Sequence, residues 1–292
     1  MEGIDMINTD RFAVVGGDAR QLAMAESILA DGYEVYMVGF ENIELKEGLV
    51  SCSLEEAFKK AEYILLPVPT VGIDGHLNAP YSRTKINLDD DFARKMSGKK
   101  VFCGVSKKLI ATSEIWKNIN LKDYSTRDDF AISNAVPTAE GAIGIAMFEF
   151  KGTIHGARCL VAGFGKVGKA LCTALNGLGA RVTASARKAE DLAWIKALRY
   201  KAIQTDNIAT LADFDIIFNT IPSLIFDEKT LAKLNPSTII IDLASLPGGV
   251  DFEAAKRLGF NVIHALALPG KVAPKTAGEI IKNTVYNMIE EG

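Results

Sequence analysis

The sequence predicts an α/β protein with two doubly wound parallel sheets, one in each half of the chain. Apolar runs rich in Val and Ile alternate with helical patterns, as they do where strands are buried on both faces of a parallel sheet. The 292 residues suffice for two domains. The first half also aligns with the second without a gap, so that Gly16 matches Gly163 and Gly32 matches Gly179.

The elements follow from this pattern in chain order. Residues 13–40 have the pattern of strand, helix and strand and begin a first domain over 1–136. Pro137 is a favoured first helical residue and predicts a connecting helix over 137–152. A second domain over 153–275 follows, with strands near 158–163, 180–186, 215–221, 238–244 and 261–267.

A C-terminal helix is predicted over 276–290. Thr276 and Glu279 have the spacing of a capping box, and an amphipathic run follows them. We expect this helix to pack back on the first domain, so that the two domains enclose a cleft.

The composition excludes several classes of partner. The net charge is −3, with 48% hydrophobic and 24% charged residues, which gives no field for binding nucleic acid or an anionic membrane. The N-terminus carries Glu2 and Asp5 without an apolar signal segment, and later apolar stretches are short or interrupted by proline. We therefore expect a cytoplasmic protein that binds neither nucleic acid nor membranes.

The cysteines and histidines do not predict a metal site. Four cysteines and three histidines are scattered along the chain, without a C-x-x-C pair. Reduced core thiols are expected, and a hydrolase triad also lacks its parts.

The second half contains the glycine fingerprint of a Rossmann dinucleotide-binding fold. Gly163, Gly165 and Gly168 follow an apolar strand and start an Ala- and Leu-rich helix, which is the context that the motif requires. A pyrophosphate is therefore expected at the helix N-terminus. The backbone amides that would hold it belong to the segment with Phe164, Lys166 and Val167.

The first half lacks this fingerprint. Asp18 and Gln21 replace the second and third glycines, which admit the pyrophosphate and bring the helix close to its strand. Asp18 also brings negative charge to the place of the phosphates. We therefore expect a Rossmann-like fold that binds no dinucleotide at this turn. Glu41 lies close to the usual position of a ribose-binding acid but is not expected to serve as one.

The end of the second strand in the second half predicts the cofactor. NAD-binding folds usually place an acidic residue about 20 residues beyond the fingerprint, but this chain has Ser185, Arg187 and Lys188 there. An arginine fork pairs bidentately with a phosphate, and the lysine adds charge. These residues favour the 2′-phosphate of NADP, with a solvated basic loop as the alternative.

Ligands of doubly wound sheets bind beyond the carboxyl ends of the strands. In the second half these ends carry small, hydroxyl and amide residues that let a flat nicotinamide approach the backbone, although ordinary turns use them too. The further cofactor-binding residues expected there are Asn219, Thr220, Ile221, Pro222, Ala244, Ser245, Leu268 and Pro269. In the first half, the segment 71–88 is either a cover over the active site or a disordered surface excursion.

Several motifs together resemble the family of the dipicolinate synthase A subunit. They are VGGDARQL, RDDFAISNAVPTAEG at 127–141, GFGKVG, NTIPS, DLASLPGGVDF and LPGKVAPKTAG. The similarity covers nearly the whole chain, and it implies an architecture like that of D-2-hydroxyacid and alanine dehydrogenases.

The resemblance also implies a reaction. A hydroxylated tetrahydrodipicolinate of the lysine pathway, or its dehydrated form, would be oxidised with NADP to pyridine-2,6-dicarboxylate in the mother cell during sporulation. The flavoprotein-like B subunit of dipicolinate synthase is implied as partner, and we expect a homo-oligomer.

This chemistry selects candidate residues. A planar dicarboxylate needs cations or hydrogen-bond donors, and removal of ring protons needs a base. The positive charge can come from Arg20, Arg127 and Lys275. The candidate hydrogen-bonding residues are Thr70, Ser106, Asn134, Thr138 and Ser245. The candidate bases are Asp18, Asp128 and Glu140.

These candidates have ordinary structural alternatives. Arg20 can pair with Asp18, Arg127 lies among helix-capping residues, and Lys275 precedes a predicted cap. Carboxylates in first helical turns are also common for electrostatic reasons alone, so the general base stays unassigned.

Two other functions stay open. One is an NADP-dependent dehydrogenase of another small carboxylate, although the His and acidic pair of hydroxyacid dehydrogenases has no obvious counterpart near the last strand. The other is an NADP-binding regulatory subunit whose partner carries out the chemistry. Activity of the chain alone, compared with that of the complex, separates these possibilities.

Overall fold

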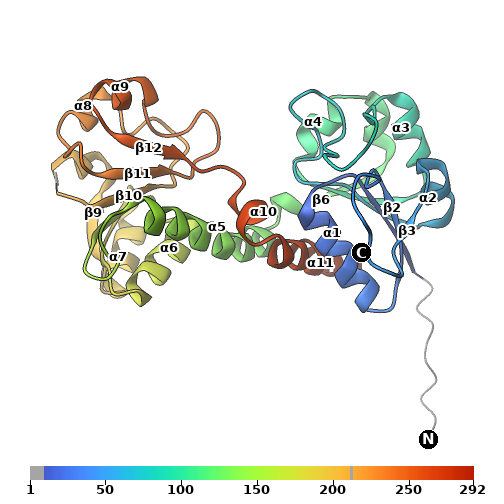
Figure 1. The fold of residues 1–292 in the computed structure, drawn as a ribbon, viewed down its shortest axis with the longest axis horizontal. Coiled ribbons are helices and arrows are strands. Elements are labelled where there is room, and N and C mark those ends of the chain that lie inside the picture. Colours follow the sequence, from blue (N-terminus) through green and yellow to red (C-terminus); the bar gives the residue numbers. More distant parts are fainter. Residues whose placement is uncertain (1–9, 211–212) are drawn as a thin grey trace, which may run out of the picture. The chain divides into compact units, whose positions relative to one another are not determined.

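The computed structural model describes residues 10–210 and 213–292 (Figure 1). The chain divides into two units. The first consists of the described residues up to Ser133 together with Ala273–Gly292, and the second is Asn134–Val272. Each unit contains one six-stranded sheet whose neighbouring strands are parallel.

The sheet of the first unit has the order β3-β2-β1-β4-β5-β6. Its central strands alternate between two cores, as the two-residue period of a strand requires. Phe12 and Val14 face one core, and Ala13 and Val15 face the other. The strands are β1 (Arg11–Val15), β2 (Glu34–Val38), β3 (Val50–Ser51), β4 (Tyr63–Leu65), β5 (Lys100–Cys103) and β6 (Asn120–Asp123).

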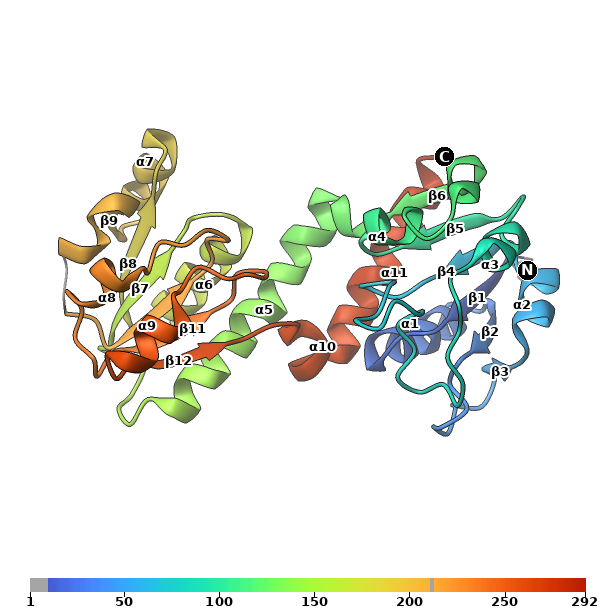
Figure 2. The ribbon, with the colours of Figure 1, turned by 90° about the horizontal axis from the view of Figure 1, so that it is seen from above.

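Helices cover both faces of this sheet. On one face, α1 (Ala19–Ala30) and α11 (Pro274–Glu290) lie side by side (Figure 2). A side chain at Gly278 of α11 would strike the backbone of Arg20 and Met24 in α1, so this glycine allows the close approach. The other face carries α2 (Leu54–Lys60), α3 (Asp90–Lys95), α4 (Ser106–Ile110) and the 3₁₀ turn η1 (Glu114–Asn118), while η2 (Tyr124–Thr126) follows β6.

The sheet of the second unit has the order β12-β11-β10-β7-β8-β9. Read in reverse, from β9 to β12, this order is the same as that of the first unit and of the doubly wound dinucleotide-binding fold. The strands are β7 (Arg158–Ala162), β8 (Arg181–Ala186), β9 (Lys201–Gln204), β10 (Ile216–Asn219), β11 (Ile239–Asp242) and β12 (Asn261–His264). The predicted α/β class with two Rossmann-like sheets is confirmed.

The helices of the second unit also form two layers (Figure 1). One core lies between the sheet and α5 (Asp128–Glu149), α6 (Lys166–Gly177), α7 (Ala189–Ala197) and α10 (Leu268–Val272). The opposite core lies beneath η3 (Thr205–Thr210), α8 (Glu228–Leu231) and α9 (Phe252–Arg257).

Two expected helix starts and one unexpected strand differ from the structure. The connecting helix was expected to begin at Pro137, but α5 begins at Asp128 and contains Pro137 in its interior. The acidic first turn of α5 favours the earlier start. Pro137 lacks the amide that would bond to the carbonyl of Ser133, so α5 continues through the proline with one fewer hydrogen bond.

The other two differences are smaller. The last helix begins at Pro274, so Thr276 lies within its first turn and does not cap it. Strand β9 was not among the strands expected, because its four residues are short and partly exposed at the edge of the sheet. The predicted return of the last helix to the first domain is confirmed, since α11 packs on α1.

Candidate functional site

The glycine turn after β7 leaves the start of α6 open. Gly165 is the N-cap of α6, and no side chain bonds to the cap. A Cβ added to Gly165 would meet nothing within 4 Å. At Gly168 a Cβ would instead strike the carbonyl of Gly163, so the helix and strand are as close as the fingerprint requires. This turn therefore offers uncapped backbone amides to an anion.

The remaining residues of the turn differ in exposure. Phe164 is buried in the core, and Lys169 places its ammonium over the Phe164 ring. Lys166 is exposed, and Val167 is half-buried. Of this group, Gly165 and Lys166 therefore lie where a ligand can reach them.

Ser185 supports the turn from beneath. Its side chain is fully buried, and its hydroxyl oxygen accepts a hydrogen bond from the Gly163 amide at 3.2 Å. Thr205 lies 3.4 Å from the same hydroxyl. Ser185 thus shapes the glycine turn and does not face solvent.

Arg187 and Lys188 follow β8 and are exposed. Neither forms an ion pair with a residue that the structure describes. Lys188 is also the N-cap of α7, without a side-chain bond of its own at that cap. Two cations next to the glycine turn are therefore available to a ligand.

A buried amide and carboxylate hold the loops after β10 and β11 together. Asn219 and Asp242 are partners in the register of the two strands, and both are fully buried. Asn219 Nδ2 donates to Asp242 Oδ1 at 2.8 Å, and the amides of Ala244 and Gly249 donate to the same carboxylate at 3.1 and 2.9 Å. A buried charge without partners would be costly, so these bonds fix the path of the loop.

The other predicted residues after β10 and β11 differ in their exposure and contacts. Thr220 Oγ1 donates to the carbonyl of Ala162 at 2.9 Å, behind the glycine turn. Pro222 and Ser245 are exposed, whereas Ile221 is half-buried. Ala244 is buried, and its carbonyl oxygen lies 3.1 Å from His264 Nε2. The exposed strand-end residues can therefore contact a ligand.

Leu268 and Pro269 are core residues. Leu268 is 4% exposed, and a Cβ at Gly141 of α5 would lie 3.2 Å from the Leu268 Cβ. Pro269 is also buried. Their side chains pack within the second unit and do not form an open surface.

In the first unit, the equivalent turn is closed. Asp18 caps α1 and accepts from the Arg20 amide at 3.0 Å, while Gln21 Oε1 accepts from the Asp18 amide at 3.1 Å. Asp18 and Gln21, which replace two fingerprint glycines, thus form a capping box. The first-turn amides that could bind a phosphate are used inside the protein.

The segment 71–88 closes the turn from outside. Its Leu77 lies against Gly16, and the Gly17 amide donates to the carbonyl of Asn78 at 2.8 Å. Leu77 and Leu88 are buried in the core of the first unit. This segment is therefore an ordered part of the domain, folded over the place where a dinucleotide would bind.

Arg20 and Thr70 join the strand ends of the first unit. Arg20 forms a bidentate pair with Asp18 and donates from Nη2 to the carbonyl of Val68 at 2.6 Å. Thr70 is fully buried, and its hydroxyl bonds to the carbonyls of Pro67 and Gly104 at 2.8 and 3.0 Å. Arg20 keeps Nη1 without a hydrogen bond to the described residues, whereas the Thr70 hydroxyl is committed to the backbone.

Asp123 orders the next strand end. It accepts from the amides of Val105 and Ser106 at 3.3 and 2.7 Å and from the Ser125 hydroxyl at 2.6 Å. Burial raises the pKa of Asp123, but the bonds from Ser125 and Ser106 outweigh it and hold this pKa below its usual value. Val105 has φ +64°, rare for a β-branched residue, so the backbone here is held in a strained form.

Arg127 is committed to ion pairs. Its Nε lies 2.9 Å from Asp129 Oδ1, and its Nη2 lies 2.8 Å from Glu291 Oε1. Hydrogen bonds from Arg127 keep the pKa of Asp129 well below its usual value. Arg127 therefore ties the end of α11 to the start of α5 through ion pairs, which the helix-capping alternative did not foresee.

The remaining candidates lie on two helices. Thr138 Oγ1 donates to the carbonyl of Asn134 within α5 at 2.7 Å, a bond typical of Thr inside helices. Glu140 is exposed on α5, as is Asp128 at its start. Lys275 is exposed in the first turn of α11. The cleft expected between the domains stays a prediction.

The described residues offer no metal cluster and no membrane span. Among residues 10–210 and 213–292, no group of three or more His, Cys, Asp or Glu could hold a metal ion. No helix in that part of the chain is long and apolar enough to span a membrane. Burial raises the pKa of the Cys159 and Cys172 thiols to about 12, so both remain protonated at neutral pH.

Sequence reasoning missed three polar residues at strand ends. Asp123 is the last residue of β6, Asp242 the last of β11 and His264 the last of β12. Asp242 and His264 follow apolar residues, and the rule that ligands lie beyond carboxyl ends would have selected them. Asp123 follows Lys122 in a polar edge strand, which gave no such signal. The Phe252 ring lies 5.2 Å from the His264 ring, centre to centre.

Two family models match the chain. Residues 11–124 match the N-terminal domain of the dipicolinate synthase A subunit. Residues 138–247 match the NAD binding domain of D-isomer specific 2-hydroxyacid dehydrogenases.

Relatives match over nearly the full length. The dipicolinate synthase A subunit of Bacillus subtilis (strain 168) is 35% identical over 290 residues, covering 98% of both chains. The crystal structure of the corresponding protein from Bacillus halodurans has a TM-score of 0.87 and 32% identity, covering 97% of this chain and 98% of the other. D-lactate dehydrogenase of Escherichia coli, at 16% identity and a TM-score of 0.61 over 97% of each chain, shares the fold.

The open glycine turn agrees with these similarities. A dehydrogenase-type domain binds a nicotinamide dinucleotide, and the second unit has both the strand order and the uncapped turn for it. The chain therefore belongs to the family of dipicolinate synthase A subunits and is an oxidoreductase with a nicotinamide dinucleotide-binding domain.

Proposed function

We propose that this chain uses NADP to oxidise a hydroxylated tetrahydrodipicolinate, or its dehydrated form, to pyridine-2,6-dicarboxylate. The observation that carries the choice of NADP is the pair Arg187 and Lys188, exposed after β8 and without ion pairs among the described residues. A 2′-phosphate would neutralise both. When bound, the cofactor supplies a hydride acceptor at its nicotinamide ring.

The residues of the second unit have distinct tasks in this proposal. The uncapped amides after Gly165 hold the pyrophosphate. Asn219 and Asp242 keep the loops after β10 and β11 in place, so that the exposed Ser245 and Pro222 can line the nicotinamide site. Neither Asn219 nor Asp242 contacts the ligand, because both are fully buried.

The first unit holds the dicarboxylate. Arg20 has its orientation fixed by Asp18 and the Val68 carbonyl, and its Nη1 is left to pair with a substrate carboxylate. The half-buried Ser106 hydroxyl, at the next strand end, can donate a second hydrogen bond. The oxidised bond of the dehydrated form is a ring CH–CH or CH–N bond, from which a hydride leaves to NADP and a proton leaves to a base. The hydroxylated form must also lose a water molecule before the ring is aromatic.

The proposal extends to assembly and place of action. The relatives are named as the A component of dipicolinate synthase, which implies a complex with a second component. We propose that this chain likewise works with a flavoprotein-like B subunit, as a homo-oligomer, in the cytoplasm of the mother cell. Light scattering of the chain alone and mixed with the B subunit would test both associations.

The direct test is an oxidation assay. The chain, alone and with the B subunit, is given the lysine-pathway intermediate and NADP, and the near-ultraviolet absorbance of reduced nicotinamide is followed. We expect reduction of NADP together with formation of the pyridine dicarboxylate. Absence of both, with NADP binding shown by calorimetry, would contradict the proposal, and turnover of another small carboxylate instead would assign a different dehydrogenase activity.

A further inference from the structure

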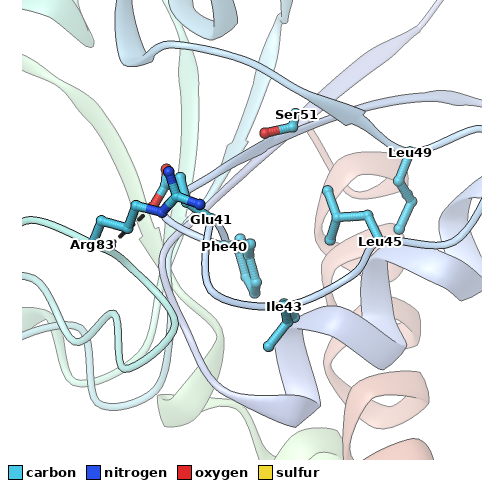
Figure 3. A pocket seen from close by; sticks show the side chains of 7 residues that line it. All are labelled: Phe40, Glu41, Ile43, Leu45, Leu49, Ser51 and Arg83. Carbon is cyan, nitrogen blue, oxygen red and sulfur yellow. Dashed lines mark hydrogen bonds between the residues drawn. The ribbon is translucent and has the colours of Figure 1, made fainter.

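A pocket lies entirely in the first unit, beside the carboxyl end of β2 (Figure 3). Its volume is about 420 Å³, within the usual range for small-molecule sites. The floor and wall are apolar, and the rim carries one acid and one base of opposite charge. The residues are Phe40, Ile43, Leu45 and Leu49 for the apolar part, with Glu41 and Arg83 at the rim.

The pocket lies where the second strand of the sheet ends, which is the ribose-binding position of dinucleotide-binding folds. Glu41 follows β2, which pairs with β1 in the first sheet as β8 pairs with β7 in the second. In dinucleotide-binding folds, an acidic residue at the end of this second strand bonds to the ribose hydroxyls. The first unit thus keeps a ribose-type acid, whereas the second unit has Arg187 and Lys188 at the equivalent place.

The Glu41 carboxylate is held in position and stays charged. Its Oε1 accepts from the Gly39 amide and its Oε2 from the Arg83 amide, each at 3.1 Å. Burial raises the pKa of Glu41, but these bonds outweigh it and lower the pKa below its usual value. Each oxygen retains acceptor capacity, so a vicinal diol can bond to both.

The neighbouring phosphate position is closed. Leu77 covers Gly16, the Gly17 amide bonds to Asn78, and Asp18 caps α1. A dinucleotide cannot continue from the pocket into this turn. A nucleotide in the pocket would therefore be limited to one nucleoside unit, and its phosphate would need another cation as partner.

Arg83 can supply that cation. It comes from the segment 71–88, which closes the turn, and it is exposed at the rim of the pocket. Its guanidinium forms no ion pair with a described residue. An unpaired arginine next to a fixed carboxylate fits a ligand that carries both a diol and a phosphate.

We propose that this pocket binds a nucleoside 5′-monophosphate. The flat base lies over the half-buried side chains of Ile43 and Leu45, the ribose diol bonds to Glu41, and the phosphate pairs with Arg83. The site is separate from the proposed NADP site and does not depend on the proposed reaction.

The test is calorimetry of the full chain with adenosine 5′-monophosphate, in the presence of saturating NADP to fill the cofactor site. We expect one molecule bound per chain. Glu41→Gln should weaken binding about tenfold, as loss of a charge-assisted bond does. The 2′,3′-dideoxy nucleotide should bind the native chain about as weakly as the monophosphate binds Glu41→Gln. The affinity for the dideoxy nucleotide should not fall further in Glu41→Gln.

Two further variants complete the test. Arg83→Ala should weaken binding of the monophosphate but not of adenosine, because only the monophosphate carries the charge that Arg83 meets. Arg187→Asp, in the second unit, should leave monophosphate binding unchanged. Absence of binding at millimolar concentration, equal binding of the dideoxy nucleotide by the native chain, or loss of binding in Arg187→Asp alone would overturn the proposal.

Discussion

The turns after β1 and β7 occupy the same place in two sheets of the same strand order, but only one of them is open. At the first, Asp18 and Gln21 form a capping box, and Leu77 lies against Gly16. At the second, Gly165 leaves α6 without a side-chain cap. The difference shows that a capping box uses the same backbone amides that otherwise bind a phosphate.

The largest effect is expected from closing the open turn. Gly165 aligns with Asp18, and a side chain at Gly165 meets nothing in the protein. Gly165→Asp should therefore keep the fold, because Asp is a good N-cap. It should weaken NADP binding about a hundredfold or more, because the new side chain caps the turn amides and brings negative charge to the phosphate position. Calorimetry and thermal unfolding measure the two effects.

The matched control is Gly144→Asp on α5, which adds the same charge at another glycine with open space around it. Its NADP affinity should equal that of the native chain. If Gly165→Asp retained native affinity, the open turn would not be the cofactor site.

The next effect compares the carboxylates that order the strand-end loops. Asp242 is fully buried with three donors, whereas Asp123 is partly exposed. Asp242→Asn should lower the free energy of unfolding by about 2–3 kcal/mol, and Asp123→Asn by about 1 kcal/mol. Asp251→Asn is the control, because Asn caps α9 as well as Asp does. A larger loss for Asp123→Asn in denaturant unfolding would reverse this ranking.

Cofactor choice is expected to give a moderate effect. Arg187→Asp should weaken the binding of NADP about tenfold more than the binding of NAD, because it replaces a partner of the 2′-phosphate with a repelling charge. Lys233→Asp, which changes an exposed cation after α8 by the same amount, controls for net charge. Titration of both variants with both cofactors decides the matter, and an equal loss for NAD and NADP would refute the assignment to the 2′-phosphate.

The smallest effect is expected at the closed turn. Asp18→Ala should destabilise the first unit by about 1 kcal/mol through loss of its cap, without creating dinucleotide binding, since Leu77 and Asn78 still cover the turn. Asp89→Ala removes the cap of α3 and should cost a similar amount. Dinucleotide bound by Asp18→Ala in the first unit would show that the loop is not the barrier.

Local patterns predicted much of this molecule, and contacts between distant residues account for what they missed. The fingerprint glycines, the apolar strands and the return of α11 were visible because each depends on nearby residues or on periodicity. The start of α5 was misplaced because Pro137 is a strong local signal for a helix start, and Asp128 was weighed as a base or capping residue and not as the beginning of this helix.

The candidate site was predicted less completely. Ser185, Leu268 and Thr70 were selected by residue type and position, but all three are buried, and burial depends on packing that one sequence does not reveal. The closing of the first turn by Leu77 and Asn78 depends on a contact across the fold, between segments distant in sequence. Asp242 was overlooked although it ends an apolar strand, the signal used for its neighbours.

Hydrogen exchange with and without NADP tests most directly the claim that the fold occurs twice and binds the dinucleotide once. We expect slower exchange on NADP binding in residues 163–168 and 185–188, with no change in residues 16–21. Slower exchange at residues 16–21, or none at residues 163–168 with NADP bound, would contradict it.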